Sequence, residues 1–152
     1  MLQRRRRSQT ELFKSCRVLG NSSSIRLLGV SYRNGEGVEQ NHYKAAECFQ
    51  RASELGESDA MNLLGLCYKD GEGVRHSYSK DVEYLSKSAE LGNSNGILYL
   101  GNCYKNGEGV RQNYSKALEL GNKIALHKLG LCYENGEGVR QNYYKAIEYY
   151  QK

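Results

Sequence analysis

One glycine-rich pentapeptide occurs four times in this chain of 152 residues. It reads Asn-Gly-Glu-Gly-Val at 34–38, 106–110 and 135–139, and Asp-Gly-Glu-Gly-Val at 70–74. A Leu-Gly pair precedes each copy, and the glycines of these pairs, at positions 29, 65, 101 and 130, are 36, 36 and 29 residues apart. A period of 36 residues favours a solenoid of stacked helix pairs.

Apolar residues recur at helical spacing before each pentapeptide. In the first unit, the positions i, i+3, i+4 and i+7 hold Ile25, Leu28, Gly29 and Tyr32, which form one stripe of a helix. The same stripe recurs at Met61, Leu64, Gly65 and Tyr68, at Ile97, Leu100, Gly101 and Tyr104, and at Leu126, Leu129, Gly130 and Tyr133. Glycine inside a helix costs about 1 kcal/mol relative to alanine. Its recurrence predicts that the next helix crosses there, too close for a Cβ atom.

The pentapeptide marks the turn between this first helix, helix A, and a second helix, helix B. Gly35 supplies the left-handed residue that closes helix A, Gly37 allows a second unusual backbone angle, and Val38 folds back as an apolar plug. Good N-cap residues for helix B then fall at one aligned position, at Asn41, Ser77, Asn113 and Asn142. A phosphate-binding loop is disfavoured, because the pentapeptide follows a helix and no Lys-Ser or Lys-Thr follows it.

The repeated pattern Leu-Gly-x-x-Tyr-x-x-Gly-x-Gly-Val-x-x-[Asp/Asn]-Tyr-x-Lys-Ala, nearly intact in four copies, resembles that of the Sel-1-like repeat family, which is related to the tetratricopeptide repeats. The resemblance implies an all-α fold, an α/α superhelical solenoid of stacked antiparallel helix pairs that serves as a scaffold or adaptor. Family members serve in endoplasmic-reticulum degradation complexes, cell-wall synthesis control and bacterial signalling.

We expect a basic disordered tail at 1–9 and an array at 10–152. The array comprises a partial unit (10–21), units at about 22–57 and 58–93, a shortened unit (94–122) and a truncated unit (123–152).

The third unit departs from the pattern because its interval of 29 residues leaves it seven residues short. The missing piece matches Val82–Ser88, in the middle of helix B. Seven residues are about two helical turns and shift the helical phase by only ~20°. We therefore expect this helix B to survive as a stub with its faces aligned, and the array to bend or loosen near Lys116–Asn122.

In the second unit, Asp81 stands where the other units have alanine. We expect it at an edge near the helix N-terminus, where a negative charge is tolerated.

The ends of the chain also depart from the pattern. The chain starts partway into a unit, and it stops at Glu-Tyr-Tyr-Gln-Lys before a helix B is complete. Tyr149 and Tyr150 then have no following repeat to cover them. We expect a fragment or a truncated, non-functional product of a longer repeat protein, and the alternative is self-association through the uncapped C-terminal helix.

The net charge of +5 comes from the start of the chain. The first twenty residues hold six of the 22 basic side chains and one of the 17 acidic ones, which leaves 16 of each in the remainder. A neutral body argues against nucleic acid as the main ligand. The longest uncharged apolar stretch, Gly96–Tyr104, is too short to span a membrane, and no apolar signal sequence is present. We expect a cytoplasmic chain with reduced thiols, or a nuclear one if the Arg4–Arg7 run directs import.

The residues suited to catalysis or metal binding do not fall at spacings that would bring them together in one site. Cys67, Cys103 and Cys132 occupy one column, about 10 Å apart by the usual spacing of packed helices, which is too far for a disulfide. A small buried residue is the expected role of this column. Some secreted relatives in the family carry paired cysteines and bind or slowly hydrolyse β-lactams. The resemblance places those cysteines near Ala89 and Ile97, and neither is cysteine here. We expect no catalytic, cofactor or metal site, with a lactam-binding or lactam-hydrolysing enzyme as the alternative.

A second face of helix A is the candidate partner-binding surface, since helix A lines the concave groove in tetratricopeptide-like arrays. It combines a basic row, Arg33, Lys69 and Lys105, with apolar side chains, and it suits an acidic peptide segment or a partner helix of another protein. The alternative is an ordinary solvated helix face. The twelve candidate residues are Arg26, Val30, Arg33, Asn62, Leu66, Lys69, Leu98, Asn102, Lys105, His127, Leu131 and Glu134.

Overall fold

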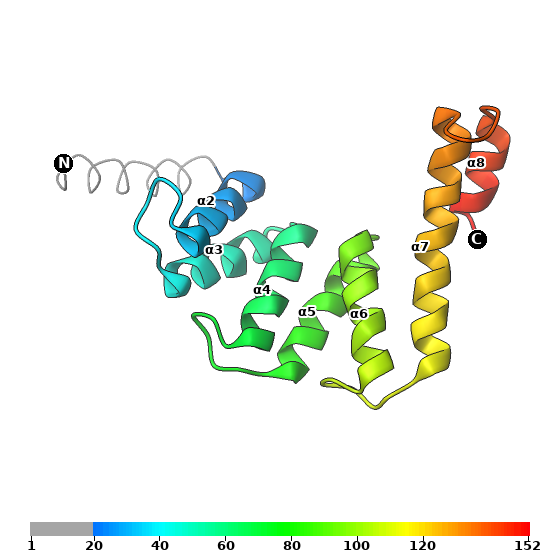
Figure 1. The fold of residues 1–152 in the computed structure, drawn as a ribbon. Helices are drawn as coiled ribbons and strands as arrows, with labels where there is room; N and C mark the ends of the chain where they lie inside the picture. The colour runs from blue at the N-terminus through cyan, green and yellow to red at the C-terminus, as the bar shows by residue number, and fades with distance from the viewer. Residues whose placement is uncertain (1–19) are drawn as a thin grey trace.

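The computed structural model describes residues 20–152, which form seven α-helices and no strand (Figure 1). The helices are α2 (Ser22–Asn34), α3 (His42–Glu54), α4 (Ser58–Asp70), α5 (Tyr78–Glu90), α6 (Ser94–Asn106), α7 (Tyr114–Asn135) and α8 (Tyr143–Tyr150). Each helix packs against the next along the chain, and α4 also contacts α6. The all-α solenoid of stacked helix pairs is thereby confirmed. The basic tail at 1–9, and the partial unit at 10–21 apart from its last two residues, lie outside the described residues.

The pentapeptide forms the predicted turn in all four copies. Its first glycine closes helix A in the left-handed region, with φ of 76° at Gly35 and 70° at Gly71, and its second glycine is left-handed as well, with φ of 72° at Gly37. The predicted N-caps are also confirmed, because the side chain of each accepts a hydrogen bond from the backbone N–H three residues further on. They are Asn41, Ser77, Asn113 and Asn142.

The glycine inside helix A allows a close crossing of helix B, as predicted. A Cβ atom on Gly29 would lie 2.6 Å from Cε1 of the buried Phe49 ring, and one on Gly65 would lie 2.9 Å from Oδ1 of Asp81. Gly130 is covered in the same way by the ring of Tyr150. Gly101 is less crowded, since its nearest neighbours would be 3.7 Å away. The crossing is therefore looser in the third repeat.

A lysine of helix B lies over the tyrosine ring that ends helix A in every repeat. The Nζ atom is 5.3 Å from the ring centroid for Lys44 and Tyr32, and 4.8 Å for Lys80 and Tyr68. The third and fourth repeats hold the equivalent pairs Lys116–Tyr104 and Lys145–Tyr133. A cation over an aromatic face contributes about 0.5–1 kcal/mol at an exposed site. This contact accounts for the Tyr and Lys of the repeated pattern.

The third and fourth repeats share one helix, which corrects the expectation of a short stub. The stretch from Tyr114 to Asn135 is a single 22-residue α-helix, α7, with α6 packed beside its first half and α8 beside its second half (Figure 1). The seven-residue deletion preserves helical phase, so Ala117, Leu120 and Ile124 continue one stripe through the expected break. We refer below to repeat one (α2, α3), repeat two (α4, α5), repeat three (α6 and the first half of α7) and repeat four (the second half of α7 and α8).

Asp81 is buried rather than at an edge, which is a second correction. It does lie in the first turn of α5, but only 1% of it is exposed, because α5 packs directly on α4 at Gly65. Burial raises the pKa of its carboxyl group to about 6, while the Coulombic attraction of Lys69 opposes that rise. Among the described residues, its Oδ1 atom has no hydrogen-bond partner. A buried carboxylate with one unpaired oxygen is destabilising in a column where the other repeats have alanine.

Candidate protein-binding surface

Three basic side chains of the predicted helix A face form ion pairs with the next repeat. The Nε atom of Arg26 lies 2.9 Å from Oε1 of Glu57, and that of Arg33 lies 3.2 Å from Oε2 of Glu72. In the next repeat, Nζ of Lys69 lies 3.2 Å from Oε2 of Glu108. These cations therefore join neighbouring repeats, and most of the basic row is already neutralised within the chain.

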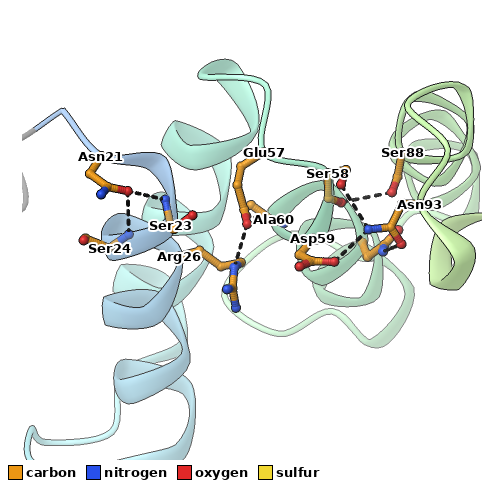
Figure 2. Close-up of polar contacts among 11 residues, drawn as sticks. Asn21, Ser23, Ser24, Arg26, Glu57, Ser58, Asp59, Ala60, Ser88 and Asn93 are labelled. Atoms are coloured by element: carbon orange, nitrogen blue, oxygen red, sulfur yellow. Dashed lines mark hydrogen bonds and ion pairs between the residues drawn. The ribbon is translucent and has the colours of Figure 1, made fainter. Parts of the chain in front are cut away.

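Asn62 is buried and belongs to a polar cluster between repeats two and three. Its side-chain amide donates to Oδ1 of Asn93, the N-cap residue of α6, at 2.8 Å. Asn93 in turn donates to Ser58 and Asp59 at the start of α4, and Ser88 donates to the backbone carbonyl of Ser58 at 3.0 Å (Figure 2). Between repeats one and two, the equivalent contact is the hydrogen bond that Arg26 donates to Glu57, the N-cap residue of α4. These contacts fix where each new helix A begins.

The exposed members of the predicted face gather on α6 and α7. Leu98, Asn102 and Lys105 are exposed on α6, and within residues 20–152 Lys105 makes no ion pair. His127 and Leu131 are exposed on α7. The remaining members are less accessible: Val30 and Leu66 are partly buried, and Glu134 accepts a hydrogen bond from the hydroxyl of Tyr150.

A cleft of about 230 Å³ lies where α6, α7 and α8 meet. Its apolar wall comes from the start of α6, the middle of α7 and the end of α8, and of the predicted residues it includes only His127. The sequence did not predict this cleft, because its lining depends on the continuous helix α7. The lining residues are Gly92, Ser94, Ile97, Lys123, Ile124, Leu126, His127, Tyr149, Tyr150 and Lys152.

The three cysteines of the cysteine column form no disulfide, and two of them are buried. Cys67 and Cys103 are buried, and burial is the main reason that the pKa of each thiol is raised to about 11. Such thiols are protonated at neutral pH and make poor nucleophiles.

In the described part of the chain, His, Cys, Asp and Glu side chains form no group of three that fits a metal ion. None of the helices between residues 20 and 152 combines the length and apolarity needed to cross a membrane.

Stacked helical hairpins, closed by left-handed glycines and joined by polar contacts between successive helices A, define an α-solenoid repeat protein. The chain belongs to the Sel1 repeat family, whose repeat matches residues 22–57, 58–93, 94–125 and 123–152. The third and fourth matches overlap at residues 123–125, in the middle of α7. Proteins built from this repeat generally mediate protein–protein interactions.

Solved structures with the same fold support this assignment. A protective antigen of uropathogenic Escherichia coli with an SLR fold is 32% identical with a TM-score of 0.66, and the match covers 91% of this chain and 31% of that one. This chain therefore spans about a third of that antigen. A Sel1 repeat protein from Oxalobacter formigenes (23% identity, TM-score 0.62, coverage 95% and 67%) shares the fold. The cysteine-rich protein B of Helicobacter pylori (24% identity, TM-score 0.61, coverage 77% and 88%) shares it as well. No curated protein matches the sequence.

Proposed function

We propose that this chain is a non-catalytic scaffold or adaptor that binds a segment of another protein on the helix A side of α6 and α7. The bound segment is an amphipathic peptide or helix whose apolar side chain enters the cleft between α6, α7 and α8. The cleft is the observation that carries this proposal, because it combines an apolar wall with a few polar side chains at its edge, as recognition sites do.

The charges around the cleft favour an acidic segment. Lys123 lines the cleft and makes no ion pair within the described residues, and Lys105 is the exposed end of the basic row. Arg33 and Lys69, by contrast, already contact glutamates of the chain. The attraction for acidic groups therefore comes from Lys105 and Lys123.

The test is the selection of binding peptides from a random displayed library, followed by affinity measurements with the purified chain. The variant carries His127→Glu and Leu131→Glu, two substitutions at exposed positions of α7. Because both add negative charge and one removes an apolar contact, we expect the affinity of the selected peptides to fall roughly tenfold or more. Leu55→Lys, at an exposed leucine between α3 and α4, is the matched control and leaves the affinity unchanged.

Two results would contradict the proposal. One is a selection in which no peptide is enriched over the background of the library. The other is an enriched peptide that binds the double variant as tightly as the unaltered chain, with both proteins showing the same helical circular dichroism.

A further inference from the structure

Two junctions between repeats are closed by the same three contacts. The first is the ion pair from the end of helix A to the glutamate of the next pentapeptide, Arg33–Glu72 and Lys69–Glu108. The second is the hydrogen bond from helix A to the next N-cap, Arg26–Glu57 and Asn62–Asn93. The third is the fit of the second pentapeptide glycine against the preceding helix B. A Cβ atom on Gly73 would overlap the carbonyl group of His42, and one on Gly109 would overlap that of Tyr78.

The junction between repeats three and four has both of its faces open. Leu118 on the repeat-three side is 67% exposed, while Val82, at the same position in repeat two, is 9% exposed. Leu129 on the repeat-four side is 37% exposed, while Leu64, at the same position in repeat two, is 1% exposed. Among the described residues, a Cβ atom on Gly138 would meet nothing within 4 Å, and Lys105 and Glu137 form no ion pair.

The straight helix prevents one chain from closing this junction by itself. About 1.5 Å of rise per residue puts Glu137, just beyond the end of α7, roughly 30 Å along the helix from Leu118. Figure 1 shows the turn between α7 and α8 at the opposite end of α7 from the end of α6. The two open faces nevertheless carry matching groups: a cation at Lys105, an anion at Glu137, and an exposed leucine on each side.

We propose that repeat four of a second copy of this chain closes the junction, so that two chains exchange their fourth repeats in a symmetric dimer. Lys105 of each copy then pairs with Glu137 of the other, and Leu118 is covered as Val82 is covered in repeat two. A turn that opens into a continuous helix is a low-cost route to such an exchange. Gly121 marks the opened turn. The aligned Gly56 and Gly92 are left-handed, with φ of 83° and 78°, whereas Gly121 lies inside α7, where an added Cβ atom would meet nothing within 4 Å. This inference goes beyond the proposed function: its residues lie outside the cleft, and only Lys105 is shared with the proposed binding surface.

Light scattering after size-exclusion chromatography of the full chain tests the dimer, with Leu118→Lys as the first variant. Leu118 is exposed in the single chain, so the substitution leaves the fold intact, but it places a charge in the proposed contact. We expect the dimer dissociation constant to rise by roughly tenfold or more. Leu55→Lys, a leucine-to-lysine change far from the junction, is the control and retains the dimer.

Charge reversal then distinguishes exchange between chains from any other association. Lys105→Glu alone and Glu137→Lys alone each place like charges at both junctions of the dimer. Each therefore weakens it by roughly tenfold, since one ion pair is replaced by a like-charge pair at each of the two junctions. A mixture of the two variants places opposite charges at both junctions, and we expect a heterodimer as stable as the original dimer.

Three results would overturn the inference. The first is a chain that stays monomeric at all concentrations. The second is a dimer that Leu118→Lys leaves unchanged, which would point to association through α8 instead. The third is a mixture of the two charge variants that associates no better than either variant alone. A chain that binds selected peptides but fails these tests would leave the proposed function standing.

Discussion

The junction between repeats two and three and the junction between repeats three and four use the same sequence columns, yet only the first is closed. The closed junction holds the N-cap Asn93 through Asn62, and Ser88 anchors the start of α4. In the open junction, Leu98 stands in the column of Asn62, and the counterpart of Ser88 falls within the deleted seven residues. Asn122, the counterpart of Asn93, therefore lacks the side chains that begin a new helix A, and α7 continues through it. Leu-Gly-Asn alone does not end a helix in this fold.

The largest expected effect compares the leucines of two Leu-Gly pairs. Leu64 is buried at the junction between repeats one and two, which is closed by the same contacts, so Leu64→Ala leaves a cavity and lowers the free energy of unfolding by about 2–5 kcal/mol. Leu129 occupies the same column but is exposed, and we expect Leu129→Ala to cost about 1 kcal/mol or less. Urea denaturation, at a protein concentration where the chain is monomeric, measures both values. Equal losses would contradict the difference between the two junctions.

The buried carboxylate of Asp81 makes the closed junction sensitive to pH. Its pKa is raised from 3.8 to about 6 by burial, so the folded chain disfavours the ionised form, and that cost is present above pH 6 and absent below about pH 4. Lys69 opposes the rise in pKa, and Glu108 and Asp70 add to it. Asp81→Asn removes the titration, and we expect it to stabilise the chain by about 3 kcal/mol at pH 7.

Denaturation of the Asp81→Asn variant at several pH values measures this gain. It shrinks as the pH falls through 6 and disappears near pH 4, because the protonated aspartic acid then carries no charge either. A gain that is the same at pH 4 and pH 7 would show that the ionisation of Asp81 is not its cause. Glu83→Gln, on an exposed side of the same helix, serves as the control for removing one negative charge.

Two glycines test the difference between a close helix crossing and an opened turn. Gly29→Ala places a Cβ atom against the ring of Phe49, which is fully buried, and we expect a loss of about 1–3 kcal/mol. Gly121→Ala meets no neighbour and favours the helix, so we expect a gain of about 1 kcal/mol. Thermal unfolding monitored by circular dichroism compares the two. A loss of stability in Gly121→Ala would indicate that this residue needs a left-handed turn.

The sequence predicted the repeated parts of the fold because each has a local cause. The left-handed glycines, the N-caps such as Asn41, and the crossing at Gly29 follow from backbone geometry within one unit. The fused helix α7 did not follow, because its local signals, Leu120, Gly121 and Asn122, are those of a turn. The turn does not form there because the side chains that would hold the start of a new helix A are missing. Those side chains come from other parts of the array, so the residues of the turn itself do not reveal that they are missing.

The prediction of the binding face was limited for the same reason, because contacts between repeats are not visible in the sequence of one repeat. Helical spacing predicts Arg26, Arg33 and Lys69 on one face of successive helices A, but it gives no information about the glutamates with which they pair. Those glutamates come from turns that are about 30 to 40 residues away in the chain, at separations of 31 and 39 residues in the first two pairs. Whether an exposed cation is available to a partner therefore depends on how repeats stack.

The smallest expected effect concerns the lysine that lies over the tyrosine ring in every repeat. Lys80→Gln removes the cation above Tyr68 but keeps most of the aliphatic chain, and we expect a loss of about 0.5–1 kcal/mol. Lys116→Gln makes the same change above Tyr104 in repeat three, which has the open junction. Because this contact lies within one repeat and not between repeats, the two losses should be equal, as measured by urea denaturation. A clearly larger loss for Lys80 would show that the open junction also loosens the pairing of helices inside repeat three.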